Sequence, residues 1–234
     1  MRTLDLNQAE IKITQGIRSF VGTKNVFVGI SGGIDSAITA FLCVKALGRK
    51  RVFGVLMPYG RQKDISDSIA VVNQLNIKYF QKDIKPIVDQ YKIADNKFVI
   101  ANIMSRVRMT VLYAHANSKN GLVIGTTNKS EMSVGYFTKF GDGGSDFEPI
   151  ANLYKTEIFK MAKILNVPPN IINKKPTAGL WDNQTDEDEL GFTYLDLDNF
   201  LQGVVINSGI ESKIKNLIDN SEHKRHLPTT ISID

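Results

Sequence analysis

Residues 29–36 read GISGGIDS, and their first two residues are the end of the apolar run VFVGI at 26–30. The pair Gly32 and Gly33 indicates a tight turn, and the periodic apolar stretch after it predicts a helix over 34–47. A strand, a glycine turn and a helix N-terminus together suit an anion, because unpaired N–H groups and the positive end of the helix dipole face the turn. The sequence therefore predicts an anionic ligand at this turn.

The same alternation of strand and helix continues along the chain. Apolar runs predict strands over 26–30, 51–58, 77–80 and 121–127. Helical spacing of apolar residues predicts helices over 6–21, 34–47, 64–75, 98–118 and 155–165, with a mostly irregular stretch at 168–191 and a helical tail to about 220. This order predicts an α/β fold with a three-layer, doubly wound and mostly parallel sheet.

Ligands of such a sheet bind beyond the carboxyl ends of its strands. Three segments break the periodicity there: GISGGIDS, GTTNKSE at 125–131, and FTKFGDGGSDFEP at 137–149. We therefore expect the site to be built from these three segments. The glycines of the third segment favour a mobile lid.

Composition limits the class of protein. The chain has 234 residues, of which 42% are hydrophobic and 23% charged, and we interpret 1–234 as one domain. Its net charge of +5 and pI near 9.1 favour a polyanionic partner, which charge alone does not identify. Cys43 is the single cysteine, so a disulfide framework and a thiolate metal cluster are excluded. No apolar run approaches the roughly 18 residues of a membrane span, so we expect a cytoplasmic protein.

The opening turn matches neither common phosphate motif. The string G-x-x-x-x-G-K-[ST] of the P-loop is absent, and Gly29, Gly32 and Gly33 have the wrong spacing for G-x-G-x-x-G. An acid, Asp35, stands where phosphate is expected, and this arrangement is repulsive unless a cation lies between them. Asp35 is therefore a candidate Mg²⁺ ligand. Ordinary capping by Ser and Asp explains Asp35 and Ser36 but not two consecutive glycines after a strand.

SGGIDS resembles the pyrophosphate loop (PP-loop) of the ATP pyrophosphatase superfamily. Four further blocks resemble ammonia-dependent NAD synthetase: NIMSRVRMTVLY at 102–113, GTTNKSEMSVGYFTKFGDGGSDFEPIANLYKTE at 125–157, KKPTAGLWDNQTDEDELGFTY at 174–194, and EHKRHLP at 222–228. They occur in the family's order. The resemblance implies a fold like that of the adenine nucleotide alpha hydrolases, a single domain without a glutaminase domain, and amidation of deamido-NAD by ammonia with ATP.

The resemblance also assigns residues to ATP and Mg²⁺. It implies that the loop holds the phosphates through Gly29, Ile30, Ser31, Gly32, Gly33, Ile34, Asp35 and Ser36. Thr126 contacts ATP by the same resemblance, and Lys155 and Thr177 hold the departing pyrophosphate. Asp35 and Glu131 are the implied Mg²⁺ ligands. Without the resemblance, Glu131 and Lys155 read as exposed helix charges.

The resemblance implies a second group of residues for deamido-NAD: Arg106, Lys139, Asp146, His223 and Lys224. A carboxylate near the acyl adenylate can bind ammonium and help to remove a proton, and Asp142 is the candidate; its alternative role is to shape a glycine turn. Asp142 and Lys155 are thus the implied catalytic residues. The family also implies a homodimer with its active sites near the subunit interface.

Two other classes of function stay open. A tRNA-modifying enzyme can use the same loop, but the sequence has no catalytic cysteine pair and no basic extension with interleaved aromatics, so we expect no nucleic-acid partner. A nucleotide-binding module that only senses adenylates would not need Glu131, Lys155 and Thr177 together. We expect small-molecule substrates, namely ATP, deamido-NAD and ammonia.

Overall fold

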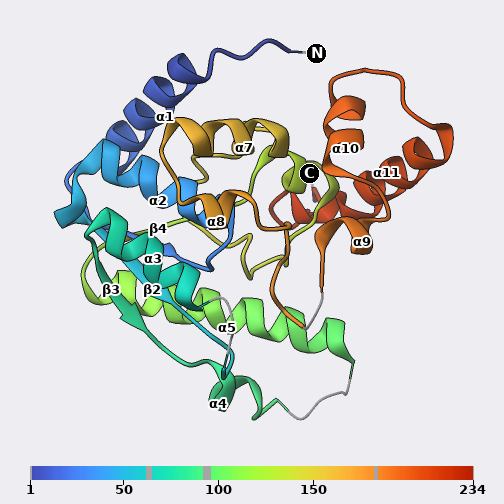
Figure 1. Ribbon diagram of the computed structural model, residues 1–234. Helices are drawn as coiled ribbons and strands as arrows, with labels where there is room; N and C mark the ends of the chain where they lie inside the picture. The colour runs from blue at the N-terminus through green and yellow to red at the C-terminus, as the bar shows by residue number, and fades with distance from the viewer. Residues whose placement is uncertain (1, 62–64, 92–95, 182–183, 234) are drawn as a thin grey trace.

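A four-stranded parallel sheet lies at the centre of the molecule, with its strands in the order β3-β2-β1-β4 (Figure 1). The computed structural model describes residues 2–61, 65–91, 96–181 and 184–233. The strands are β1 Val26–Gly29, β2 Val52–Leu56, β3 Lys78–Gln81 and β4 Leu122–Ile124. In the register of the sheet, Val26 pairs with both Val52 and Leu122. The predicted parallel α/β fold is confirmed.

The helices connect the strands and then extend beyond the sheet. They are α1 Leu6–Val21, α2 Ile34–Leu47, α3 Ile65–Leu75, α4 Lys85–Val88, α5 Lys97–Ser118, α6 Lys129–Val134, α7 Lys155–Ile164, α8 Pro169–Ile172, α9 Asp186–Leu190, α10 Tyr194–Leu201 and α11 Ser208–Ser221. Two short 3-10 turns, η1 Arg49–Arg51 and η2 Glu222–Lys224, complete the described elements.

The two faces of the sheet are buried by different helices. Val26 and Val28 of β1 join the large core with α1, α2, α3 and α7, while Phe27 between them packs against α5. Because successive side chains of a strand point to opposite faces, the run VFV supplies both cores. Figure 1 shows α5 on one side of the sheet and α1, α2 and α7 on the other, which gives three layers.

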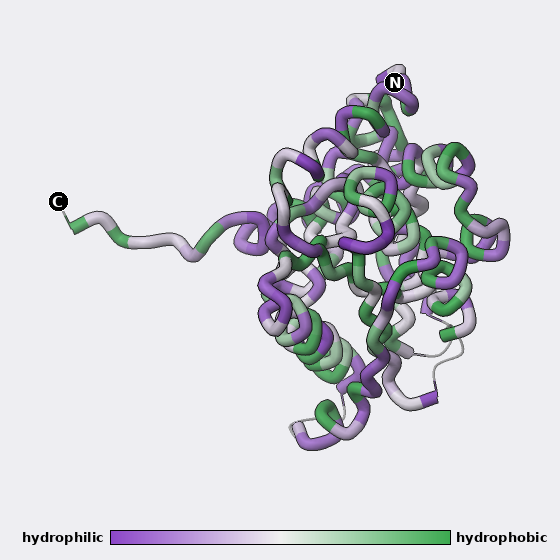
Figure 2. The backbone as a smooth tube through the Cα atoms, turned by 90° about the vertical axis from the view of Figure 1, so that its left-hand side faces the viewer, coloured by the Kyte–Doolittle hydropathy of each residue, from purple (hydrophilic) through white to green (hydrophobic). Residues whose placement is uncertain are grey.

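A second, smaller apolar cluster joins α6 to the C-terminal helices. Its buried members are Val134, Leu190, Phe192, Tyr194, Leu197 and Ile214. This cluster fixes α9 and α10 beside α6, and so it holds their acidic side chains close to the carboxyl ends of the strands. After η2 the chain extends away from the rest of the protein (Figure 2), with Leu227 and Ile231 exposed.

One predicted strand is clearly too long. The strand expected over 121–127 ends at Ile124, because Asn128 is already the N-cap of α6 and the N–H of Gly125 donates to Phe147. The stretch 168–191 is mostly irregular, as predicted, apart from the short helices α8 and α9; residues 182–183 lie outside the described residues. Both helices are too short for their periodicity to stand out.

Cys43 has the buried structural role expected of a lone cysteine. It lies on α2 with no exposed surface, and its burial raises the pKa of the thiol to about 12. A thiol with so high a pKa is a poor nucleophile at neutral pH. In the described parts of the chain, no helix has both the length and the apolar character needed to cross a membrane.

Candidate active site

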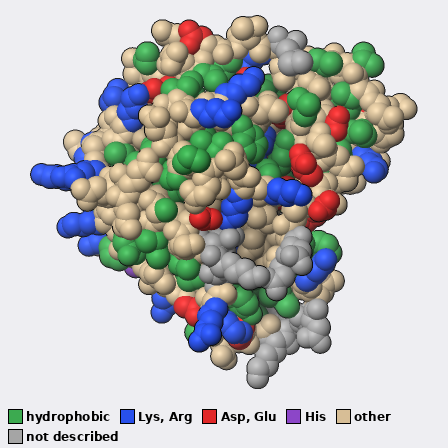
Figure 3. All heavy atoms as spheres, viewed as in Figure 1, with side chains coloured by type: hydrophobic (Ala, Val, Ile, Leu, Met, Phe, Trp, Pro, Cys, Tyr) green, Lys and Arg blue, Asp and Glu red, His purple; other side chains and the backbone are tan. Residues whose placement is uncertain are grey.

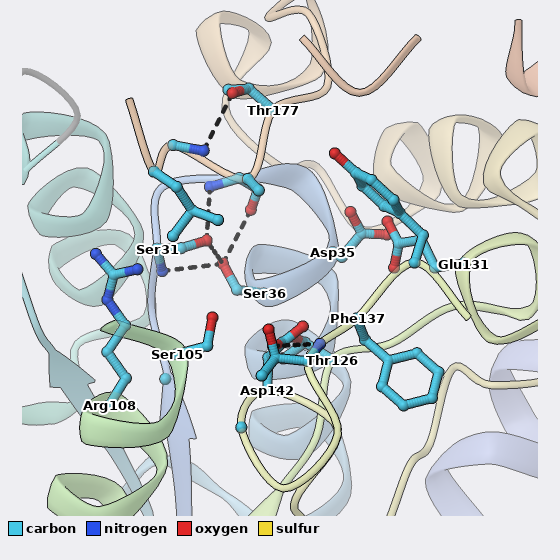
Figure 4. Close-up of a pocket in the computed structure, with 18 of the residues that line it drawn as sticks. Ser31, Asp35, Ser36, Ser105, Arg108, Thr126, Glu131, Phe137, Asp142 and Thr177 are labelled. Atoms are coloured by element: carbon cyan, nitrogen blue, oxygen red, sulfur yellow. Dashed lines mark hydrogen bonds between the residues drawn. The ribbon is translucent and has the colours of Figure 1, made fainter. Parts of the chain in front are cut away.

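A cavity of about 420 Å³ opens at the carboxyl ends of β1 and β4 (Figure 4). Its walls come from the turn between β1 and α2, one face of α5, the segment after β4 and the stretch 174–181. Pockets of about 300–1,000 Å³ are typical for small ligands, so this one can hold a nucleotide. Figure 3 shows Lys and Arg side chains next to Asp and Glu side chains near the centre of the face seen in Figure 1.

The turn between β1 and α2 is held by its own hydroxyl groups. Ser36 Oγ donates to the carbonyl of Gly33 over 3.0 Å and accepts from the N–H of Ser31 over 3.2 Å. Ser31 Oγ accepts from the N–H of Gly33, also at 3.2 Å. Gly32 has a φ of +81°, which favours glycine. Gly33 caps α2 without a side-chain oxygen, so the start of this helix is open to an anion from the pocket.

A buried lysine joins two acids at one end of the pocket. Lys155 begins α7 and is 2% exposed, and its Nζ lies 2.6 Å from Asp35 Oδ2 and 3.0 Å from Glu131 Oε1. Burial by itself would lower the pKa of Lys155, but the nearby carboxylates outweigh burial and raise it. For Glu131, burial acts in the opposite direction and is the main reason that the pKa of its carboxyl is raised. Asp35 and Glu131, which are 96 positions apart in the sequence, thus both contact the ammonium of Lys155.

Side chains around this cluster fix its geometry. Asn128 caps α6 in a reciprocal pair with Glu131, and its Nδ2 donates to Asp35 Oδ1 over 2.9 Å. A third carboxylate, Asp186, accepts from Tyr194 Oη over 2.9 Å, and its burial raises its pKa. One lysine therefore faces three acidic side chains.

The acids suit a cation shared with a ligand. Within the described residues, no three His, Cys, Asp or Glu side chains converge in a way that could hold a metal ion. Mg²⁺ commonly binds through one or two carboxylates together with substrate phosphates, rather than in a cage made of protein alone. Asp35 and Glu131 fit that arrangement, since both reach the pocket wall beside the turn between β1 and α2.

A buried acid that sequence reasoning missed holds α6 against α7. Asp198 on α10 is 1% exposed, accepts from Ser130 Oγ, and accepts from the N–H of Thr156 over 2.9 Å. Ser130 Oγ in turn accepts from the N–H of Lys155 over 2.9 Å. These contacts place Glu131 and Lys155 relative to each other. In the sequence, Asp198 is one of two acids on an amphipathic helix, so no local signal marks it.

Most residues expected at ATP line the pocket. These are Gly29, Ile30, Ser31, Gly33, Ile34, Asp35, Ser36, Thr126, Glu131, Lys155 and Thr177, with Asp142 and Lys224 from the other sets. Gly32 lies between two of them but is not part of the wall. Thr177 Oγ1 accepts from the N–H of Gly179 over 3.1 Å, which shapes the turn that brings it to the pocket.

Asp142 lies in the pocket at a glycine-rich turn. Its Oδ1 accepts from the N–H of Thr138 over 3.0 Å. The side chain is open to the pocket, but the protein around it removes hydration, and this desolvation raises the pKa of its carboxyl above the ordinary value. The turn-shaping role and an acid–base role are therefore compatible in one side chain.

The residues expected at deamido-NAD are more scattered. Arg106 is exposed on α5, and neither Lys139, Asp146 nor His223 lines the pocket. Lys139 Nζ donates to the carbonyl of His223, and Lys224 Nζ donates to Gly135 over 2.7 Å. These two lysines tie the C-terminal segment to the turn after α6.

Asp146 has a structural contact instead of a place in the pocket wall. Its Oδ2 accepts from the N–H of Val123 over 2.8 Å, and its Oδ1 accepts from Tyr113 Oη over 3.1 Å. It therefore holds the segment after the glycine turn along β4. The described chain brings Lys224 to the pocket wall, but not Arg106, Lys139, Asp146 or His223.

Replacing Gly125 with alanine should weaken ATP binding about tenfold and destabilise the fold by about 1–3 kcal/mol. A Cβ there would lie 1.9 Å from Glu148 Oε1, whose carboxylate accepts from the N–H of Thr127. Moving Glu148 would displace Thr127, and with it the preceding residue, Thr126. Isothermal titration with ATP and chemical unfolding measure both effects.

Gly16→Ala is the matched control, because Gly16 lies inside α1 and nothing lies within 4 Å of a Cβ added there. That variant should bind ATP normally and gain stability, since alanine favours a helix interior over glycine by about 1 kcal/mol. Equal ATP affinity in Gly125→Ala and Gly16→Ala would contradict the close packing assigned to Gly125.

The parallel sheet and the glycine turn after β1 place the chain among α/β nucleotide-binding proteins of the PP-loop superfamily. The model of the NAD synthase family matches residues 6–228. The NH(3)-dependent NAD(+) synthetase of Pyrococcus horikoshii is 46% identical over 246 residues, which cover 97% of this chain and 95% of that protein. The chain belongs to the NAD synthase family, a family of ligases.

Two solved structures are similar to the chain over nearly its full length. NMN synthetase from Francisella tularensis has a TM-score of 0.94 at 35% identity, with 99% of this chain and 100% of that chain covered. NH3-dependent NAD synthetase from Campylobacter jejuni has a TM-score of 0.81 at 32% identity, with 98% and 100% covered.

Proposed function

We propose that the chain forms NAD by ATP-dependent amidation of deamido-NAD with ammonia, the final step of NAD biosynthesis. The observation that carries this proposal is that the PP-loop, the cluster of Lys155, Asp35 and Glu131, and Asp142 all line the same cavity. Family membership supports the same reaction. In this proposal residues 1–234 act as one domain in the cytoplasm.

The reaction needs activation because oxide is a very poor leaving group from a carboxylate. In the first half-reaction, a nicotinate carboxylate oxygen bonds to the α-phosphorus of ATP, and pyrophosphate leaves with the electron pair of the broken P–O bond. In the second half-reaction, ammonia bonds to the acyl carbon, AMP leaves with the electron pair of the C–O bond, and the nitrogen loses a proton. Fixed donors that meet the growing charge accelerate the first step.

The described residues divide this work. The turn between β1 and α2 holds the phosphates, and Lys155 and Thr177 hold the departing pyrophosphate, with Thr126 at the nucleotide. Asp35 and Glu131 are the proposed ligands of Mg²⁺, which supplies charge neutralisation on the phosphates when bound. Because Lys155 is buried between these acids, its ammonium keeps a fixed position beside the loop.

The second substrate brings a pyrophosphate of its own and a carboxylate. Arg106, Lys139, His223 and Lys224 are its proposed cationic contacts, with Asp146 as an acceptor. Exposure of Arg106 and His223 suits a site that is completed at a contact between two copies of the chain. We therefore propose a homodimer, and light scattering of the purified protein should give twice the mass of 26.1 kDa.

The direct test is incubation with ATP, Mg²⁺, ammonium and deamido-NAD. We expect NAD, AMP and pyrophosphate in equal amounts, and no product when ammonium is omitted except the adenylate and pyrophosphate. Absence of NAD together with tight, salt-sensitive binding of tRNA would favour a tRNA-modifying enzyme instead.

Amidation of the mononucleotide is the second candidate function. The observation that favours it is the TM-score of 0.94 with NMN synthetase from Francisella tularensis. Both reactions amidate the same nicotinate carboxylate, so the pocket chemistry is shared and only the remainder of the substrate differs. Comparing kcat/KM for deamido-NAD and for nicotinate mononucleotide decides between them, and we expect the dinucleotide to be preferred.

Replacing Asp142 with asparagine should separate the two half-reactions. Asparagine keeps an oxygen for the N–H of Thr138 but cannot bind ammonium or take its proton. We expect pyrophosphate release within about twofold of the wild type, and amide formation slower by about 10²-fold. The ratio of pyrophosphate to NAD, followed in one reaction mixture, should rise from one.

Asp219→Asn serves as the control, since Asp219 is an exposed acid on α11 outside the pocket wall. It should leave the ratio at one. If Asp142→Asn slows both half-reactions equally, Asp142 shapes the glycine turn and is not the ammonia-side acid–base group.

A further inference from the structure

Arg108 is a basic residue of the pocket wall that the reaction proposed above does not use. It lies on α5 with a half-buried side chain, and its Nε donates to the carbonyl of Met57 over 3.1 Å. Met57 directly follows β2, so this contact fixes the guanidinium at the end of the sheet. Figure 4 shows the side chain rising from α5 on the side of the pocket where Ser31 lies.

The charge of this guanidinium is incompletely compensated. Desolvation lowers the pKa of Arg108 to about 10, which still leaves it charged at neutral pH. Among the described residues, no carboxylate forms an ion pair with it, and its terminal nitrogens make no hydrogen bond. Asp142 is the acid whose charge acts on it. A partly buried cation without a paired anion is costly, so the site is prepared for an anionic ligand.

Two other cations of the pocket differ from Arg108 in this respect. Lys155 is paired with both Asp35 and Glu131, and Lys224 donates to two carbonyls. Their donors are therefore engaged by protein groups. Arg108 has a planar fork of N–H donors, which matches the paired oxygens of a phosphate.

The position of Arg108 selects one phosphate group. In the proposed function, the β- and γ-phosphates lie at the loop with Lys155, and ammonia approaches beside Asp142. The α-phosphate and the acyl group bound to it lie between those two places. Arg108 lines the same pocket on the side where Ser31 of the loop lies (Figure 4), and Asp142 is the acid whose charge acts on it, so the α-phosphate is the phosphate that we assign to it.

We propose that Arg108 is a further catalytic residue, whose guanidinium binds an α-phosphate oxygen of ATP and of the acyl adenylate. This inference rests on the proposed function. While the carboxylate oxygen bonds to the α-phosphorus and the bond to the pyrophosphate oxygen breaks, negative charge on the equatorial oxygens is held by Arg108. No proton moves in this step, and the electron pair of the broken bond leaves with pyrophosphate.

Arg108→Met and Arg108→Lys test the assignment, with Arg49→Met as the matched control because Arg49 is exposed in η1. We expect Arg108→Met to release pyrophosphate about 10²-fold more slowly than the wild type. Isothermal titration should show AMP bound about tenfold more weakly and adenosine bound equally well, because only AMP carries the phosphate. Arg108→Lys should have a rate of pyrophosphate release and an AMP affinity between those of Arg108→Met and the wild type. Arg49→Met should match the wild type in both.

A rescue experiment separates catalysis from structure. Added methylguanidine should restore part of the pyrophosphate release of Arg108→Ala, whereas a purely structural defect would not respond. Should Arg108→Met fail to fold, Arg108→Lys keeps the charge and the same AMP and adenosine titrations apply to it.

Three outcomes would overturn the proposal. Pyrophosphate release by Arg108→Met within about twofold of the wild type would remove Arg108 from the first half-reaction. An equal loss of AMP and adenosine affinity would show that Arg108 shapes the pocket for the nucleoside and does not bind the phosphate. Weaker binding of deamido-NAD with unchanged AMP affinity would assign it to the second substrate. The AMP and adenosine titrations need no turnover, so they stand even if the wild type makes no NAD.

Discussion

Replacing Lys155 with methionine should abolish pyrophosphate release, with a loss of about 10³-fold, and should destabilise the fold by about 3–5 kcal/mol. The ammonium is 2% exposed and holds two carboxylates at 2.6 and 3.0 Å. Its removal leaves Asp35 and Glu131 facing each other, with Asp186 nearby, without the charge that compensates them. Pyrophosphate release and denaturant unfolding at neutral pH measure the two effects.

Lys215→Met is the control for stability. Lys215 pairs with Glu211 at 2.6 Å, but both side chains are on the exposed surface of α11. Its loss should cost less than about 0.5 kcal/mol, because exposed pairs one helical turn apart contribute little. Equal unfolding midpoints for Lys155→Met and the wild type would show that the buried cluster does not stabilise the fold.

Replacing Asp35 with asparagine should slow pyrophosphate release by about 10³-fold while leaving the fold intact. Asparagine keeps the shape of the side chain, and it removes one of three acids that share a single lysine. The lost charge is the one that we assign to Mg²⁺ binding. The rate should be measured against Mg²⁺ concentration, and the variant should need far more Mg²⁺ than the wild type.

Asp89→Asn is the matched control, since Asp89 also pairs with a lysine, Lys85, but on the exposed surface and outside the pocket wall. Its rate and Mg²⁺ dependence should equal those of the wild type. A near-normal Mg²⁺ dependence in Asp35→Asn would remove Asp35 from the metal site.

Local sequence patterns predicted the elements of the sheet with small errors. The helix expected over 34–47 is α2, and the strand expected over 26–30 is β1 with its last residue removed. These elements are decided by apolar periodicity and by glycine conformations within one segment, so the sequence carries their signal. The short helices α8 and α9 were missed because four or five residues contain too few turns for a period.

Part of the pocket wall could be predicted from the sequence. The loop from Gly29 to Ser36 could be read directly, because its chemistry lies within eight consecutive positions. Glu131 and Lys155 were identified through family blocks, and the contact between them depends on the packing of α6 against α7. Asp198, which bridges these helices through Ser130 and Thr156, carries no sequence signal at all.

The two arginines of α5 show the limit most clearly. The sequence alone determined that this long segment is a helix carrying Arg106 and Arg108, and it determined the glycine turn after the first strand. Positions two apart on a helix differ by about 200°, so the two side chains face different directions. Only the packing of α5 on the sheet decided that Arg108 faces the pocket and Arg106 the solvent. The rotation of α5 about its own axis depends on contacts with distant strands, and such contacts are absent from any local pattern.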